Sequence, residues 1–299
     1  MPSVTVLIPA YNEEANIAFA LMDITGQNEN DFKLDKIIVI SDGSTDNTVK
    51  EAKSVNDTRI SIRDYKDRKG KKIRTSEAYR DIETDIIVQM DADGMLSNAY
   101  VLEQLIKPFL KDSTITLVCS RAVAHRPTTF VGNASFIGYK IWDDIRNSLK
   151  ENGIRYRCEG KLYALKTSAV KQLSIPADVM DDLYTFYYII SHGGNVAFAS
   201  EAIVYFELPS NARDYITQMT RLLGHNIQSH IDESLLNKYE TIHMYDKSRA
   251  LLVSFYKQPF WTLAYLCLHI PALFFSSMYR AKSAWMPASS TKRINRSSL

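Results

Sequence analysis

The sequence predicts an α/β fold of the Rossmann-like kind with a mostly parallel sheet, and three observations support this prediction. Short apolar runs rich in β-branched residues alternate with helix-like patterns through the first hundred residues, which is typical of βαβ units. The 299 residues are enough for one large α/β domain, or for a domain with an appendage. A hydrophobic fraction of 45% and a charged fraction of 23% indicate a folded protein with a sizeable core.

The expected elements follow one another along the chain. Strands are expected at residues 4–8, 36–40, 60–63 and 86–90, with helices between them at residues 13–27, 45–55 and 72–82. Asn12 precedes the first of these helices and Ser44 or Thr45 the second, so we expect these residues to be N-caps. Later helices are expected at residues 101–110, 134–150 and 211–239, and later strands at residues 115–122, 163–166, 196–199 and 202–206.

The formal charge of +2 hides a contrast between the body of the chain and its end. No Asp or Glu follows Asp246, whereas eight of the 36 Lys and Arg residues do, so residues 1–246 carry 28 bases against 34 acids. An acidic body argues against nucleic acid as the main partner, because phosphate binding needs clustered positive charge. The basic end suits an anionic membrane surface.

A long uncharged segment near the end of the chain predicts membrane association. Residues 258–279 contain no charged side chain, and about 20 apolar residues can span a bilayer as a helix. His269 and Pro271 near the centre weaken the case for spanning, so a spanning helix at residues 259–279 and one that lies in the interface both remain open. A basic tail, residues 280–299, follows.

The start of the chain and its cysteines bear on the compartment. The first apolar run is five residues long, ends at Pro9 and has no basic segment before it, so we expect no signal peptide and a body that faces the cytoplasm. Cys119, Cys158 and Cys267 lie far apart and lack metal-ligand spacing, so we expect reduced packing residues.

Three polar loops follow predicted strands, at residues 11–12, 41–43 and 91–94. In an open parallel sheet, ligands bind beyond the carboxyl ends of the strands. Asp91 and Asp93 are two residues apart on one such turn, where two carboxylates can converge on Mg²⁺ or Mn²⁺ that also holds phosphate oxygens. An ordinary solvated acidic turn is the alternative.

Taken together, these loops resemble glycosyltransferase family 2, whose catalytic domain has the GT-A fold. The resemblance rests on Val-Leu-Ile-Pro-Ala-Tyr-Asn-Glu-Glu at 6–14, Ser-Asp-Gly-Ser-Thr-Asp at 41–46 and Asp-Ala-Asp at 91–93, in matching order and spacing. Ser41 replaces the first Asp of the family's usual Asp-Asp-Gly-Ser loop. The resemblance implies an inverting, Mn²⁺- or Mg²⁺-dependent transfer of a sugar from a nucleotide donor, which in this family is mostly a UDP-sugar.

The resemblance also implies the donor and metal residues. It assigns the nucleoside to Pro9, Ala10, Tyr11 and Asp42, with Glu13 of the same motif among the donor-binding residues. It places Asp91 near the ribose or the diphosphate, and Asp93 on the metal. Lys71 lies in a basic stretch, residues 68–74, where the family has a Gly-Lys segment, and its charge could neutralise the diphosphate. A solvated basic loop is the alternative for Lys71.

Met-Asp-Asp-Leu at 180–183 resembles the family's Glu-Asp motif, which makes Asp182 the general base and Asp181 its neighbour. Paired acids at an ordinary helix N-terminus would look the same. Gly160 and Tyr163 fall where the family often has its acceptor loop, so the resemblance implies that they contact the acceptor.

Gln218 and Arg221 resemble the Gln-x-x-Arg-Trp motif of the polymerising branch of the family, which lies over the donor diphosphate. Leu222 replaces the Trp. This departure argues against processive polymerisation more than against donor binding. A surface Gln and Arg three residues apart on any helix are the alternative.

The predicted organisation is a GT-A domain at residues 1–230, linking helices at 231–258, the apolar helix at 259–279 and the basic tail at 280–299. The predicted function is sugar transfer at a membrane in polysaccharide or glycan synthesis, onto a glycan or lipid-linked acceptor. Three alternatives stay open: addition of one sugar to a polyprenyl-phosphate or lipid-linked acceptor, nucleotidyl transfer, and an inactive membrane module that binds the donor. The sequence leaves the sugar and the oligomeric state open.

Overall fold

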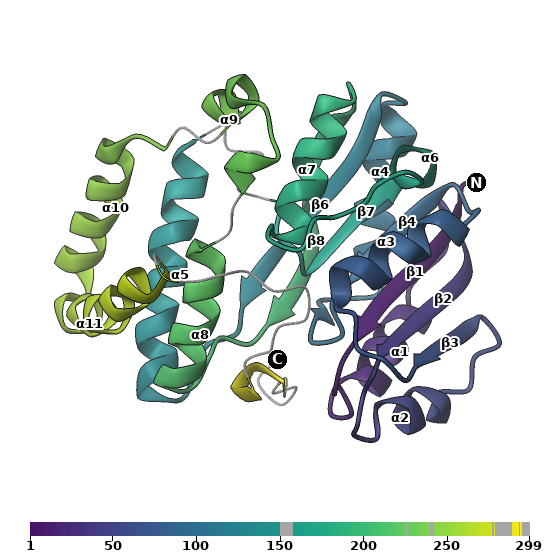
Figure 1. Ribbon diagram of the computed structural model, residues 1–299, viewed down its shortest axis with the longest axis horizontal. Helices are drawn as coiled ribbons and strands as arrows, with labels where there is room; N and C mark the ends of the chain where they lie inside the picture. The colour runs from purple at the N-terminus through teal and green to yellow at the C-terminus, as the bar shows by residue number, and fades with distance from the viewer. Residues whose placement is uncertain are drawn as a thin grey trace.

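An eight-stranded mixed sheet forms the centre of the protein (Figure 1). The computed structural model describes residues 1–149, 158–224, 227–239, 242–276, 278, 289–292 and 294. The strand order is β3-β2-β1-β4-β7-β6-β8-β5. The strands are β1 Ser3–Ala10, β2 Lys33–Asp42, β3 Ile60–Tyr65, β4 Ile86–Met90, β5 Met95–Leu96, β6 Ile115–Ala124, β7 Leu162–Lys166 and β8 Asn195–Phe206.

The helices of the sheet domain cover both faces of the sheet. On one face α1 Ile17–Thr25, α2 Thr48–Ser54 and α4 Val101–Lys111 pack on the strands, and on the other lie α3 Lys71–Asp81, α6 Thr167–Val170 and α7 Asp181–Ser191. Because both faces are covered, β1 is apolar on both sides: Val6 faces the first group of helices and Leu7 the second. The predicted α/β fold with a mostly parallel sheet is confirmed, since β1, β2, β3 and β4 pair in parallel and β6 pairs in parallel with β8.

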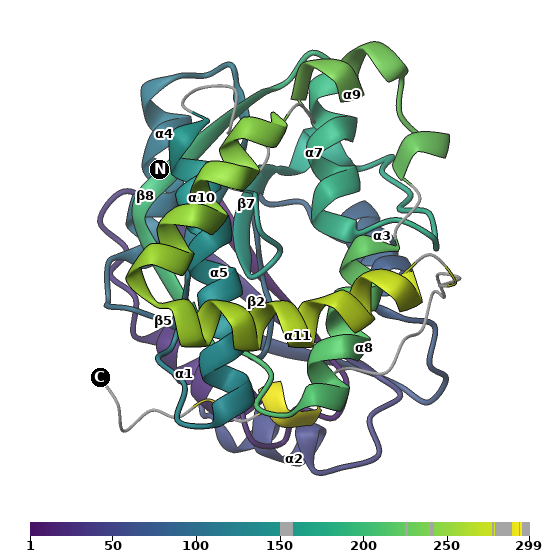
Figure 2. The same ribbon diagram turned by 90° about the vertical axis from the view of Figure 1, so that its left-hand side faces the viewer.

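A second group of helices lies beside the sheet, at the left of Figure 1. It contains α5 Phe130–Ser148, α8 Ala212–Leu223, α10 Met244–Lys257 and α11 Pro259–Ser276. Ile137, Ile141 and Ile145 of α5 form a small separate core with Ala250 of α10. Figure 2 shows α11 lying across α5 and α8, and both helices contact it. The short elements η2 Ile227–Ser229, α9 Glu233–Tyr239 and η3 Ser289–Thr291 complete the described chain.

Several predicted boundaries differ from the structure. The two strands expected at 196–199 and 202–206 form the single strand β8, whose register against β6 shifts after Ser120. The helix expected over 211–239 is divided into α8, η2 and α9, with residues 225–226 outside the described part. Residue 150, the predicted end of α5, also lies outside it.

The two predicted N-caps are wrong, because these side chains join two loops instead. The helix α1 begins at Ile17, and α2 follows Asn47 with no side-chain cap. Asn12 Oδ1 accepts from Thr45 N at 2.8 Å, and Ser44 Oγ accepts from Asn12 N at 3.2 Å. Polar residues at the carboxyl ends of β1 and β2 therefore tie neighbouring loops together, because the parallel strands bring these ends side by side.

The prediction of three reduced cysteines is wrong for two of them. Cys119 of β6 and Cys158, which precedes β7, form a disulfide with a sequence separation of 39 residues. Spacing gave no signal for this pair, because antiparallel pairing of β6 with β7 brings the two segments together. Cys267 on α11 is free and exposed.

Candidate donor and catalytic site

The predicted loops gather at one edge of the sheet. Strands β1, β2 and β4 run in parallel, so the loops that follow Ala10, Asp42 and Met90 leave from the same edge. The strand β7 is antiparallel to β4 and pairs Leu162 with Met90, so the segment before β7 reaches that edge too. Four chain segments that are far apart in sequence therefore meet at this edge.

Asp42 holds the basic loop in place. Its carboxylate accepts from the backbone N–H groups of Lys69 at 2.9 Å and Gly70 at 2.6 Å, and from Arg74 Nε at 2.9 Å. Gly70 has a φ of 98°, a left-handed backbone that favours glycine. The guanidinium of Arg68, in the same loop, lies 3.6 Å from the ring centroid of Tyr11. The predicted nucleoside residues Tyr11 and Asp42 are thus both joined to the loop before α3.

Lys71 bridges Asp91 of the predicted donor site and Asp181, the neighbour of the predicted base. Its ammonium lies 2.8 Å from Asp91 Oδ1 and 2.7 Å from Asp181 Oδ2. Burial opposes the charge on Lys71, but the two aspartates outweigh it and raise the pKa of the ammonium. Burial likewise opposes ionisation of Asp181, and Lys71 outweighs it so that the pKa of Asp181 is lowered. Lys71 and Asp181 therefore both stay charged at neutral pH. The Lys71 ammonium lies between the carboxylates of Asp91 and Asp181.

Asp91 and Asp93 converge on a cation. The ammonium of Lys161 lies 2.8 Å from Asp93 Oδ1, 3.0 Å from Asp93 Oδ2 and 3.5 Å from Asp91 Oδ2. Burial works against the charge on Asp93, yet Lys161 lowers its pKa below the ordinary value. The Lys161 ammonium stands where a divalent ion shared by both carboxylates would sit, so this pair of residues fits such an ion.

Within the described ranges, no group of three or more His, Cys, Asp or Glu side chains is placed to hold a metal. An ion at Asp91 and Asp93 therefore needs further ligands, which donor phosphate oxygens and water can supply.

Glu13 is a further acid at this edge, beside Asp93. Burial, followed by the charge of Asp93, raises the pKa of Glu13 to about 7. Its Oε1 accepts from Lys292 Nζ at 2.6 Å and its Oε2 from Asn16 Nδ2 at 3.0 Å. A carboxyl with this pKa changes charge near neutral pH, next to the carboxylates that would hold the ion.

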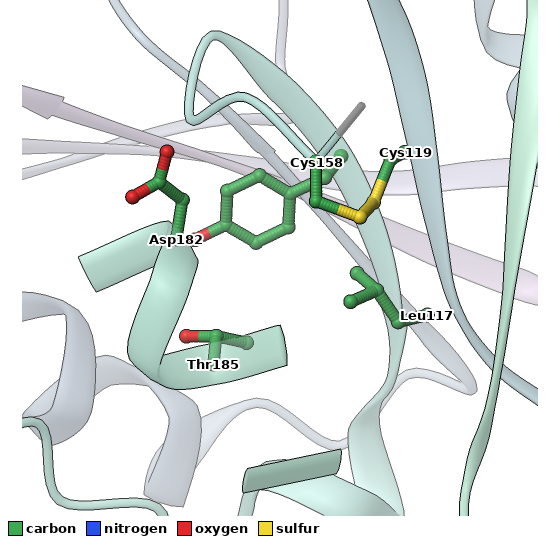
Figure 3. A pocket seen from close by; sticks show the side chains of 6 residues that line it. Leu117, Cys119, Cys158, Asp182 and Thr185 are labelled. Atoms are coloured by element: carbon green, nitrogen blue, oxygen red, sulfur yellow. A yellow bond between two sulfur atoms is a disulfide. The ribbon is translucent and has the colours of Figure 1, made fainter. Parts of the chain in front are cut away.

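Asp182 lies at the start of α7 and is one of the residues that line a small cavity (Figure 3). The cavity holds about 10 Å³, which is roughly one water molecule, and its lining includes Thr185, Cys119 and Cys158. Burial, and then the negative charge of Asp181, raises the pKa of Asp182 to about 6. A carboxyl with a pKa of about 6 is suited to take a proton at neutral pH.

The two predicted acceptor residues lie beside Asp182. A Cβ at Gly160 would come within 3.2 Å of Asp182 Oδ2, so glycine lets this segment approach the carboxylate. Tyr163 lines the cavity, but its ring is buried in the sheet and its hydroxyl lies 3.4 Å from that of Tyr79. A direct contact between an acceptor and Tyr163 stays a prediction.

Gln218 and Arg221 lie on α8. Burial lowers the pKa of Lys72 in α3, and Arg221 acts on it in the same direction, so the guanidinium lies near this helix end. The amide oxygen of Gln218 is buried. Their predicted contact with a diphosphate stays a prediction.

Sequence reasoning missed Lys161 and Lys292 as members of the site. Lys161 carried one usable signal, a basic residue next to Gly160 in the expected acceptor loop. Lys292 carried none, because it lies 279 residues from Glu13 in a tail that composition assigned to a membrane surface.

Comparisons with known proteins agree with this geometry. Residues 5–171 match the sequence profile described as Glycosyl transferase family 2. O-antigen chain rhamnosyltransferase RfbN of Salmonella typhimurium is 26% identical over 211 residues. The match covers 67% of this chain and 65% of the relative, a little less than two thirds of its length.

Two solved structures show the same fold at low identity. Mannosyltransferase PcManGT of Pyrobaculum calidifontis, in complex with GDP-mannose and Mn²⁺, superposes with a TM-score of 0.62 at 21% identity, over 93% of this chain and 84% of that one. Glucosyl-3-phosphoglycerate synthase of Mycobacterium tuberculosis, with Mn²⁺ and UDP-glucose, gives a TM-score of 0.53 at 18% identity, over 81% of each chain. The predicted GT-A fold is confirmed.

Proposed function

The chain belongs to glycosyltransferase family 2, and we propose that it transfers a sugar from a nucleoside-diphosphate donor to a hydroxyl of a glycan or lipid-linked acceptor, with inversion. The observation that carries this proposal is the separation of two groups of carboxylates at one edge of the sheet. Asp91 and Asp93 converge on a cation, whereas Asp182 is a distinct carboxylate with a raised pKa. The two groups suit the two ends of a displacement reaction.

In the proposed reaction, Asp182 accepts the proton of the acceptor hydroxyl as the hydroxyl oxygen forms a bond to the anomeric carbon. The bond between that carbon and the diphosphate oxygen breaks, and its electron pair leaves with the nucleoside diphosphate. A single in-line displacement of this kind inverts the anomeric configuration. Lys71 keeps Asp181 ionised beside the base, and burial, together with the negative charge of Asp181, keeps the pKa of Asp182 high enough for proton transfer.

A divalent ion held by Asp91 and Asp93 would supply positive charge to the departing diphosphate. Arg221 and Lys71 are cations of the chain itself near the same edge, and we propose that both contact the donor phosphates. Tyr11 and Asp42, with Pro9 and Ala10, are proposed to hold the nucleoside.

A donor panel tests the proposed activity. Purified protein with Mn²⁺ or Mg²⁺ is expected to release nucleoside diphosphate from one of UDP-glucose, GDP-mannose and a nucleotide-activated rhamnose, faster than without protein. The anomeric configuration of the product, read by NMR, is expected to be inverted, and the product length separates one addition from polymerisation. If no donor in a broad panel is bound or cleaved, sugar transfer is not the activity of this chain.

We propose that the membrane contact is made by α10 and α11 lying in the plane of the interface. Among the described residues, α11 is the single helix long and apolar enough to span a bilayer, but it packs against α5 and α8 along its side (Figure 2). Thr262 and Ala272 are fully buried, and His269 Nδ1 lies 2.9 Å from the hydroxyl of Tyr215 in α8. The side of α11 that carries Thr262 and His269 therefore faces the protein.

The opposite side of α11 is apolar and exposed. Leu263 is 51% and Ile270 is 61% exposed, and Leu252 of α10 is 68% exposed. Lys247 and Lys257 are exposed lysines of α10, and no acid follows Asp246. An apolar face bordered by cations is typical of helices that lie on anionic membranes.

Vesicle binding tests this geometry. Leu263→Glu with Ile270→Glu is expected to weaken binding to vesicles with anionic lipid at least tenfold, because charges would enter the apolar boundary. Leu110→Glu, at an exposed leucine of α4, is the matched control and is expected to bind as the parent does. Protein that stays in membranes after an alkaline carbonate wash would instead indicate a spanning helix.

A further inference from the structure

A lysine from the C-terminal end of the described chain contacts the loop between β1 and α1, residues 11–16, which we call the donor loop. The ammonium of Lys292 donates to Glu13 Oε1 at 2.6 Å, to the carbonyl of Asn12 at 2.7 Å and to the carbonyl of Tyr11. The Lys292 side chain is only 17% exposed. An ammonium has three donors. All three are used by consecutive residues of one loop, so this contact is specific to the loop conformation.

The segment that carries this lysine, residues 289–292 and 294, is tied down at both ends, and we call it the C-terminal strap. At the donor loop, Asn16 Nδ2 donates to the carbonyl of Lys292 at 2.8 Å, and Asn16 Oδ1 accepts from Ile294 N at 3.3 Å. Its other end meets Asp214, whose Oδ2 accepts from Ser290 N at 2.7 Å.

Figure 1 shows η3 of this strap between α8 and the β1–β3 half of the sheet. The strap therefore connects the donor loop with the helix that carries Gln218 and Arg221.

The donor loop has a backbone that needs such support. Asn12 has a φ of 54°, and it is the single non-glycine residue with a positive φ among those described. This left-handed conformation costs an L-residue roughly 1 kcal/mol. The carbonyls that Lys292 binds belong to Asn12 itself and to Tyr11 before it. Lys292 thus fixes the turn that sets the direction of Tyr11 and Glu13.

We propose that Lys292 is a positioning residue of the donor site, and that the C-terminal strap belongs to the donor-binding machinery. This inference rests on the proposed function, in which the loop after β1 binds the nucleoside. Lys292 acts through the loop: it orients Tyr11 and holds Glu13 beside Asp93, whose charge acts on Glu13. The predicted basic tail at 280–299 therefore has one cation that serves the site rather than a lipid surface.

Nucleotide binding by variants of the full chain tests the proposal. Lys292→Met is expected to weaken binding of the nucleoside diphosphate with Mn²⁺, measured by calorimetry, about tenfold and to raise the donor KM equally, while kcat changes less than about threefold. Lys292→Arg is expected to recover most of the affinity, since a guanidinium can donate to the same oxygens. Lys50→Met, at an exposed lysine of α2, is the matched control and should bind as the parent does. Equal affinity of Lys292→Met and the parent chain overturns the proposal.

A second measurement needs no nucleotide, and so separates this inference from the proposed function. Without ligand, amide hydrogen exchange in residues 11–20 is expected to be at least tenfold faster in Lys292→Met than in the parent, because the loop loses its clamp. Unchanged exchange there overturns the strap contact even if no nucleotide binds the parent chain. Faster exchange in Lys292→Met, together with a parent chain that binds no nucleotide, would keep the contact and reject the proposed function.

Discussion

Replacing Asp182 with asparagine should lower kcat about 10³-fold, because an amide cannot take the proton of the acceptor hydroxyl and general base catalysis is worth roughly 10²–10⁴ in rate. The substitution keeps the side-chain shape, and Asp182 contacts neither Asp91 nor Asp93 among the described ion pairs and hydrogen bonds. Donor affinity should therefore stay within about twofold of the parent value. The check is kcat from product formation together with a calorimetric titration of the nucleoside diphosphate.

Two further variants assign the role within the acidic pair. Asp178→Asn, the same chemical change in the segment just before α7, is expected to keep kcat within about threefold. Asp181→Asn removes the partner of Lys71 and the negative neighbour of Asp182, so it should shift the pH dependence of the rate to lower pH. If Asp181→Asn abolishes turnover while Asp182→Asn does not, the base is Asp181 and our assignment is wrong.

The pH dependence of the rate gives an independent check on Asp182. With a pKa raised to about 6 by burial and by Asp181, the base loses its proton as pH rises through 6, so kcat/KM should rise over that range.

The contribution of Asp182 to stability changes with pH in the other direction. The folded protein binds this proton more tightly than the unfolded chain does, so the contribution to the free energy of unfolding is present below about pH 4 and lost as pH rises through 6.

A fall in rate at acid pH with intact folding therefore points to the base and not to unfolding through this group. Glu13, with a pKa of about 7, also titrates in this range. The variant Glu13→Gln separates its contribution from that of Asp182.

Most of the fold could be predicted because its strands are local signals. The apolar runs around Val6, Val39, Ile62 and Val88 are short and rich in β-branched residues, and all four form strands. Parallel pairing then fixes where the polar loops lie, so Asp91 and Asp93 could be placed near Tyr11 from the order of motifs alone. Caps were harder to predict, because the same Asn, Ser and Thr side chains that cap helices also bond to neighbouring loops.

What could not be predicted depends on contacts between residues far apart in sequence. Lys161 reaches Asp93 only because β7 is antiparallel to β4, and an antiparallel strand inserted among parallel ones has no local signature. Lys292 and the disulfide between Cys119 and Cys158 are of the same kind. The course of α11 is a further case. An 18-residue apolar helix has the same sequence pattern whether it spans a bilayer or packs along the side of a protein.

Replacing Asp93 with asparagine should lower kcat/KM about 10²-fold to 10³-fold and remove the dependence of nucleotide binding on Mn²⁺. The carboxylate that would hold the ion most directly becomes a neutral amide, so the departing diphosphate loses the charge that stabilises it. The fold should persist, because Asp93 lies in a turn after β4 and, among the residues that the structure describes, its side chain accepts hydrogen bonds from Lys161 alone. Calorimetry with the nucleoside diphosphate, with and without Mn²⁺, measures the effect.

Lys161→Met is the matched variant, since it removes the opposite charge of the same pair. The ammonium that now lies between Asp91 and Asp93 must leave or move before an ion can bind there, so this variant should bind Mn²⁺ about tenfold more tightly than the parent in the absence of donor, as read by electron paramagnetic resonance. Asp93→Asn should weaken the same binding. If Mn²⁺ affinity is unaffected by both substitutions, the ion does not bind at these carboxylates, and the charge on the leaving diphosphate must be met by Lys71, Lys161 and Arg221 alone.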